Sequence, residues 1–144
     1  MTKKLILSLF TISALVGCNN DDDSKSTPTL VGKWKAIKFE YYKDGVFEYT
    51  ENIVDDNPTC PDYIEFKKDG SYISIENDEN CNTTSDEAGV YTSNETTITT
   101  TVGGYTEVTT IISLTNTDLK TDFTETSSQS GSVYKSVGYF KKIN

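Results

Sequence analysis

The chain has 144 residues and a formal net charge of −9; all 13 of its basic residues are lysines, so histidine and arginine are both absent. Without histidine there is no Ser-His or Cys-His nucleophile pair and no imidazole metal ligand, and without arginine there is no bidentate clamp for phosphate or carboxylate. An acidic surface also repels nucleic acid, so the composition favours a non-catalytic binding or structural module with no metal or other cofactor.

Residues 1–17 are predicted to be a cleaved signal peptide. Two lysines precede an apolar stretch at 5–16, which is shorter than the roughly 20 residues that a membrane-spanning helix needs. Leu15-Val16-Gly17-Cys18 resembles the lipobox of bacterial lipoproteins, in which the cysteine thiol accepts the lipid. We therefore expect acylated Cys18 to anchor the protein to a membrane of the cell envelope. An ordinary signal peptide with an incidental cysteine is the alternative.

Residues 18–29 are expected to form a flexible acidic tether, because they contain three successive aspartates and no side chain suited to a core. This segment resembles the export signals of surface lipoproteins of the Bacteroidota, which implies an outer-membrane protein that faces outward. A solvated periplasmic linker is the alternative. Removal of the signal peptide, which holds two lysines and no acidic residue, leaves 127 residues with a net charge of −11. That length suits one domain, at 30–144.

From residue 30 onward, short strand-like segments alternate with turn residues, and no helical period is present. Strands are expected at 32–43, 46–53, 63–68, 71–77, 88–93, 95–102, 105–114, 118–125 and 132–142. Turn pairs such as Asp44-Gly45 and Gly103-Gly104 connect most neighbours directly, which indicates an antiparallel meander. Because closure removes exposed strand edges, we predict an all-β fold, an antiparallel up-and-down β-barrel of eight or nine strands.

Side-chain alternation indicates which faces are buried. In the first strand, Trp34 and Ala36 fall on one face, whereas Ile37, Phe39 and Tyr41 fall on the other. A β-bulge near Ala36 would be needed to keep all five pointing inward, and such bends help a sheet to curl. In the strand at 105–114, alternation places Val108, Thr110, Ile112 and Leu114 on one face, which we expect to be the inner one.

Cys60 and Cys81 remain once Cys18 is assigned to lipid attachment. They lie nine and eleven residues from the turn signal Asp69-Gly70, so antiparallel strands on either side of this turn would bring them together. In an oxidising compartment such a pair predicts a disulfide. A redox-active pair is the alternative, although redox cysteines usually stand two residues apart.

Several short motifs, taken in order, resemble the small lipocalin-like lipoproteins of the Bacteroidota. They are Leu30-Val31-Gly32-Lys33-Trp34, Cys60-Pro61-Asp62-Tyr63-Ile64-Glu65-Phe66, Gly89-Val90-Tyr91 and Tyr139-Phe140-Lys141-Lys142. The resemblance covers residues 30–142 and implies a lipocalin-like barrel whose closed end is plugged by Trp34. Many lipocalins stack an arginine from the last strand on this tryptophan, a role that only Lys141 or Lys142 could fill here.

The leading functional hypothesis is a barrel that binds a small apolar or weakly polar ligand. Candidate lining residues are Phe39, Tyr41, Phe66, Ile73, Ile75, Val108, Ile112 and Phe123. The same side chains could instead fill a solid barrel. In that case the acidic surface could bind a basic protein partner, as in an inhibitor or adhesin. An enzyme that uses carboxylates and tyrosines is the least favoured class, because no catalytic motif is recognisable.

Overall fold

The computed structural model describes residues 27–144, and this part of the chain contains nine strands and no helix. The predicted signal peptide, Cys18 and most of the tether lie outside the described residues. Within the described range, no helix has the length and apolarity needed to cross a membrane. The strands are β1 Gly32–Lys43, β2 Val46–Asn52, β3 Tyr63–Phe66, β4 Ser71–Asn77, β5 Thr83–Ser93, β6 Thr97–Val102, β7 Tyr105–Leu114, β8 Asp118–Thr126 and β9 Val133–Ile143.

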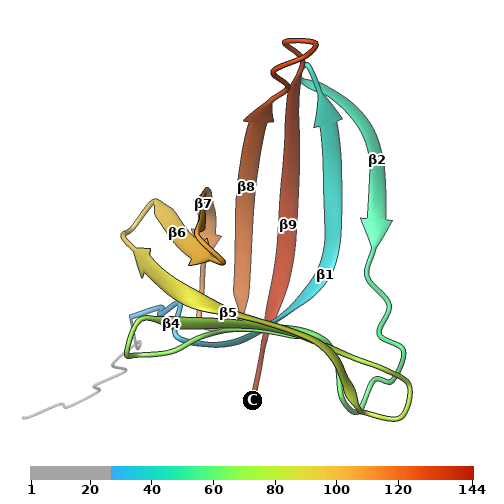
Figure 1. The fold of residues 1–144 in the computed structure, drawn as a ribbon, viewed down its shortest axis with the longest axis vertical. Coiled ribbons are helices and arrows are strands. Elements are labelled where there is room, and N and C mark those ends of the chain that lie inside the picture. Colours follow the sequence, from blue (N-terminus) through green and yellow to red (C-terminus); the bar gives the residue numbers. More distant parts are fainter. Residues whose placement is uncertain (1–26) are drawn as a thin grey trace, which may run out of the picture.

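All strand neighbours are antiparallel, and eight of the nine strands form a closed barrel, as predicted. The barrel closes through β1, which pairs with β9 along one edge and with β3 near its start on the other edge. The later half of that second edge pairs with β2, the additional strand. Figure 1 shows β8, β9, β1 and β2 standing side by side as a tall wall, with β4 and β5 crossing at its base.

The nine strands match the sequence prediction in number and order, and the largest difference is the start of β5. This strand begins at Thr83 rather than at 88, because residues 83–87 continue the ladder with β4 up to a short turn after Asn77. The added segment is acidic and hydroxyl-rich and is exposed over most of its length. It therefore lacks the apolar alternation on which the prediction depends.

The β-bulge predicted near Ala36 is present. The register between β1 and β9 shifts between Ala36 and Lys38, so Ile37 is the extra residue. The expectation that Ile37 also points inward is wrong, because it is exposed. Beyond this bulge, Phe39 lies opposite Gly138 on the inner face. The bulge thus allows one strand to supply side chains both to the buried core and to the cavity in the barrel.

Trp34 has no solvent-exposed surface and lies in the buried core, near the start of β1 and the end of β9. Its indole Nε1 donates a hydrogen bond of 2.7 Å to the carbonyl oxygen of Leu30. The Nζ atom of Lys142 lies 5.0 Å from the centre of the Trp34 ring and donates a hydrogen bond to the carbonyl oxygen of Thr29. Lys142 therefore fills the position in which many lipocalins place an arginine, and burial lowers the pKa of its amine.

Backbone conformation and close packing both favour glycine at position 32, two residues before Trp34. Its φ angle is +129°, a conformation that residues with a Cβ atom rarely adopt. An added Cβ would also lie 2.6 Å from Cε of Lys142. The Gly-x-Trp sequence thus makes room for the lysine that covers the tryptophan. Around Trp34, the buried core cluster consists of Leu30, Trp34, Phe66, Ile98 and Leu119.

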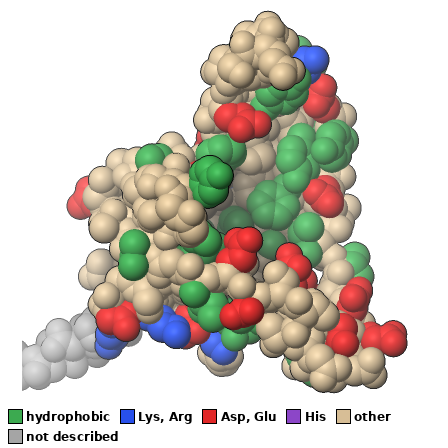
Figure 2. Space-filling view, in the orientation of Figure 1, with side chains coloured by type: hydrophobic (Ala, Val, Ile, Leu, Met, Phe, Trp, Pro, Cys, Tyr) green, Lys and Arg blue, Asp and Glu red, His purple; other side chains and the backbone are tan. Residues whose placement is uncertain are grey.

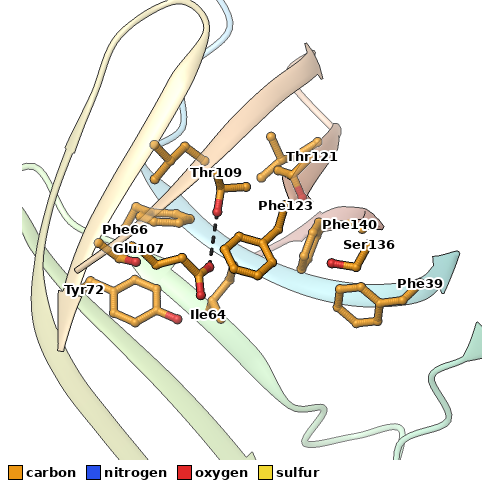
Figure 3. A pocket seen from close by; sticks show the side chains of 14 residues that line it. Phe39, Ile64, Phe66, Tyr72, Glu107, Thr109, Thr121, Phe123, Ser136 and Phe140 are labelled. Carbon is orange, nitrogen blue, oxygen red and sulfur yellow. Dashed lines mark hydrogen bonds between the residues drawn. The ribbon is translucent and has the colours of Figure 1, made fainter. Parts of the chain in front are cut away.

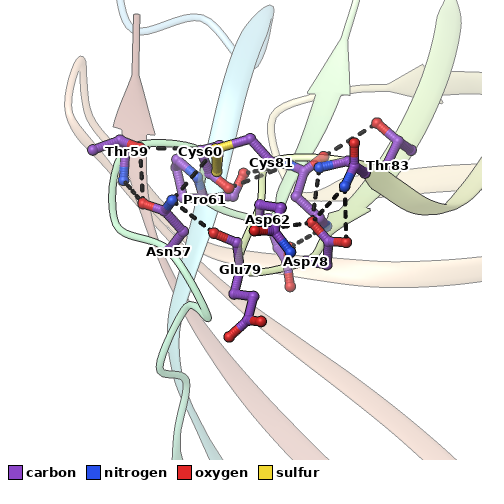
Figure 4. The surroundings of a disulfide bond; sticks show 12 residues. Asn57, Thr59, Cys60, Pro61, Asp62, Asp78, Glu79, Cys81 and Thr83 are labelled. Atoms are coloured by element: carbon purple, nitrogen blue, oxygen red, sulfur yellow. Dashed lines mark hydrogen bonds between the residues drawn. A yellow bond between two sulfur atoms is a disulfide. The ribbon is translucent and has the colours of Figure 1, made fainter.

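The predicted disulfide joins Cys60 to Cys81, with their Cα atoms 5.6 Å apart (Figure 4). It connects the loop before β3 to the turn between β4 and β5. Asn77 strengthens this connection, because its side-chain amide donates to the carbonyl oxygens of Cys60 and Pro61 and its backbone N–H donates to Asp62. Closing this loop restricts the unfolded chain and contributes about 3 kcal/mol in the chain-entropy account.

Replacement of Trp34 by alanine should lower the free energy of unfolding by about 3–5 kcal/mol, because it removes a large, fully buried ring. Chemical denaturation followed by circular dichroism measures this change. Tyr105→Ala is the matched control, since Tyr105 is 86% exposed and its loss should leave stability nearly unchanged. Equal stability of the two variants would contradict the role of Trp34 as the plug.

Candidate functional site

The barrel interior contains a central cavity of about 370 Å³ that opens to solvent on one side. Its wall draws on every strand of the closed barrel except β5. The lining residues are Phe39, Ile64, Phe66, Tyr72, Ile98, Thr100, Glu107, Thr109, Leu119, Thr121, Phe123, Ser136, Gly138 and Phe140 (Figure 3). The cavity therefore combines aromatic and aliphatic walls with a few hydroxyl groups and one carboxylate.

Aromatic rings define the shape of the central cavity. Phe39 and Phe140 meet edge to face with their ring centres 5.8 Å apart, and Phe66 lies 5.4 Å from Tyr72. Gly138 makes the first contact possible, because a Cβ at this position would lie 2.6 Å from the Phe140 ring and 3.0 Å from the Phe39 ring. The absence of a side chain at Gly138 in β9 thus leaves room for the two rings and for the cavity beside them.

A second cavity of about 370 Å³ lies toward the far ends of the tall strands and shares Phe123 and Ser136 with the first. Tyr41 and Tyr49 stack in its wall with ring centres 4.7 Å apart. The Tyr41 hydroxyl donates a hydrogen bond of 2.9 Å to Glu51. Burial, together with this carboxylate, raises the pKa of Tyr41 to about 12, so the phenol stays neutral well above pH 10.

A third cavity, of about 250 Å³, lies between β1 and β4 and shares Phe39, Ile64 and Phe140 with the central one. The second and the third cavities therefore each share wall residues with the central one. Figure 2 shows hydrophobic side chains gathered in the hollow on this face of the molecule, with acidic side chains around them. Within the described residues, no three His, Cys, Asp or Glu side chains are grouped to hold a metal ion.

Five of the eight predicted lining residues border these cavities. Phe39, Phe66 and Phe123 line the central cavity, Tyr41 lines the second and Ile75 the third. Ile73 was expected beside them, but the wall of the central cavity contains Tyr72 instead. Because Tyr72 pairs with Phe66 across the strands and points inward, alternation places both Ile73 and Ile75 on the other face of β4. Ile75 is nevertheless buried there and borders the third cavity.

The prediction that Val108 and Ile112 line the barrel is wrong, because they are 56% and 46% exposed. In β7 the inward residues are instead Thr109, which lines the cavity, and Ile111, which packs against the core. A bulge between Ile111 and Ser113 restores Leu114 to the core side. Apolar alternation suggested the opposite face, since both faces of this strand carry β-branched residues.

The sequence reasoning also missed Glu107, the carboxylate in the wall of the central cavity. Glu107 accepts a hydrogen bond of 3.3 Å from the hydroxyl of Thr109, two residues along the same strand. Glu107 lies on the same face of β7 as Thr109 and Ile111, which point inward. A prediction that included the bulge after Ile111 would therefore have placed Glu107 in the barrel.

Comparison with known proteins gives one family and one solved structure. The family described as "Lipocalin-like domain" matches residues 30–121. The solved structure is a bovine odorant binding protein, a deswapped triple mutant; it is 16% identical, has a TM-score of 0.41, and is matched over 78% of this chain and 72% of its own. No curated protein matches the sequence.

Tyr41 should ionise at about pH 12, whereas a free tyrosine ionises near 10. Because folding raises this pKa, the contribution of Tyr41 to stability is present below about pH 10 and is lost as the pH rises toward 12. Ultraviolet titration of the parent and Tyr41→Phe measures the shift, and the variant should lose the latest-ionising component. Glu51→Gln should lower the pKa of Tyr41. Loss of a component near pH 10 in Tyr41→Phe, with the component near pH 12 retained, would contradict the assignment.

Proposed function

The chain belongs to the lipocalin-like domain family, and from this premise we propose that its barrel binds a small ligand with a largely apolar body and does not convert it chemically. The observation that carries the proposal is the central cavity, whose volume of about 370 Å³ falls within the roughly 300–1,000 Å³ typical of small-molecule sites. The two adjoining cavities offer room for a longer ligand.

The chemistry of the wall supports a binding role. Phenylalanine, isoleucine and leucine side chains supply apolar contact, while the hydroxyls of Thr100, Thr121 and Ser136 can orient a polar group. Carboxylate-pair hydrolysis needs two acidic groups that flank the scissile bond. Among the described residues, Glu107 is the one carboxylate in the wall of the central cavity. The wall therefore suits retention of a ligand better than cleavage.

We also propose that the domain is tethered to the outer membrane of the cell envelope through acylated Cys18. Support comes from the sequence: a short apolar segment, the lipobox-like Leu15-Val16-Gly17-Cys18, and the acidic residues that follow. Two or three acyl chains would anchor the protein stably, whereas a single chain binds membranes only marginally.

Ligand binding can be tested by filling the cavity. Ser136 borders both the central and the second cavity, so Ser136→Phe should weaken binding of a neutral fluorescent probe, N-phenylnaphthylamine, at least about tenfold. The matched control is Ser113→Phe, because Ser113 is exposed on β7. The control should bind the probe like the parent, and both variants should melt near the parent temperature. Equal binding by Ser136→Phe and the parent would contradict the cavity site, and failure of the parent to bind apolar probes would favour an acidic protein-partner module.

The anchor is tested by metabolic labelling with a fatty acid. Cys18→Ala should lose the label, because the acceptor thiol is absent, whereas a variant with Cys60→Ala and Cys81→Ala should keep it. Undiminished label on Cys18→Ala would contradict the lipoprotein proposal.

A further inference from the structure

Nearly all the charged residues that border the three cavities are acidic. Glu107 borders the central cavity. Glu48 and Glu125 border the second cavity, and Asp62 and Glu76 border the third. Among the residues described, these walls contain one lysine, Lys135, and its amine already forms an ion pair with Asp122. A ligand inside the barrel thus meets carboxylates with no free cation beside them.

Glu107 is the carboxylate best placed to contact a ligand in the central cavity. Figure 3 shows its side chain directed toward Tyr72 and Phe123, with Phe66 nearby. The negative charge of Glu107 adds to the effect of burial in raising the pKa of Tyr72, which agrees with their proximity. Glu107 as a whole is exposed, so this residue borders the cavity and also contacts solvent.

A carboxylate among aromatic rings is a favourable environment for an organic cation. The faces of phenylalanine and tyrosine rings carry partial negative charge and attract ammonium groups within about 6 Å of the ring centre. The carboxylate adds a charge-assisted hydrogen bond to a protonated amine. An anionic group on the ligand would instead be repelled by the carboxylates and would find no free cation. The chain contains no arginine or histidine, and the lysine at the second cavity is already paired.

We propose that the ligand is a cationic amphiphile, an amine or quaternary ammonium group attached to an apolar body, with its cation held between Glu107 and the rings of Tyr72 and Phe123. The apolar body lies deeper, against Phe66, Ile98 and Leu119, which belong to the buried core. The net charge of −9 attracts such a ligand to the protein. This inference rests on the proposed function and specifies the class of ligand that the same cavity takes.

Isothermal titration calorimetry with three probes of one shape tests the proposal: phenylbutylamine, phenylbutanol and phenylbutyrate. The purified chain should bind the amine at least about tenfold more tightly than the alcohol, and the carboxylate most weakly. Glu107→Gln should reduce binding of the amine to the level of the alcohol while leaving the alcohol unaffected. Glu95→Gln removes an equal charge from an exposed turn residue and should keep the preference for the amine.

The outcomes separate this inference from the proposed function. Equal affinity for amine and alcohol, or a preference for the amine that Glu107→Gln retains, would overturn the cationic ligand while leaving the apolar binding site intact. Tightest binding of phenylbutyrate would overturn it as well. If none of the three probes binds, and the neutral fluorescent probe also fails, the proposed function itself is overturned.

Discussion

The burial of Trp34 is the interaction on which the barrel depends. The indole is fully buried, donates a hydrogen bond to the carbonyl oxygen of Leu30 just before the first strand, and is covered by Lys142 from the last strand. It therefore holds the beginning and the end of the domain against the same ring. Three residues of the same core cluster, Phe66, Ile98 and Leu119, also form part of the cavity wall. Beyond the bulge at Ile37, β1 turns the next aromatic side chains toward an interior that the core does not fill.

The unusual composition shapes the chemistry of that interior. A chain without arginine or histidine has only lysine to offer as a cation, and a lysine buried alone carries a large desolvation cost. Here Lys142 reduces that cost through the Trp34 ring and a backbone carbonyl. The walls of the cavities are left to carboxylates such as Glu107. The lysine beside Trp34 is therefore held by contacts of its own and is not offered to a ligand.

Turn residues and alternating side chains were sufficient to predict nine strands, their order, the bulge in β1 and the disulfide partners. These features depend on local geometry, since a glycine-containing turn fixes which segments pair. The face of β7 could not be predicted in the same way. Val108 and Ile112 are apolar but lie outside, and the bulge that decides the matter follows from pairing with β8 rather than from the residues of β7 alone.

Glu107 could not be identified from the sequence either, because nothing in the sequence distinguishes it from the other acidic residues, of which the chain has 22 in all. Its importance arises from the strands that surround it, which supply Tyr72 and Phe123 from distant parts of the sequence. Hydrophobic patterning identifies candidates for a wall, but polar residues inside a barrel become visible only once the register is known.

The pairing of β1 with β9 also affects how the domain folds. The register joins Lys33 to Ile143, so the barrel cannot close before nearly all of its strands have been synthesised. Contacts so far apart in sequence form slowly, because the intervening chain must first lose its freedom. A partly synthesised chain therefore lacks the partner that its first strand needs. The same pairing that completes the barrel delays its assembly until synthesis of the domain is nearly finished.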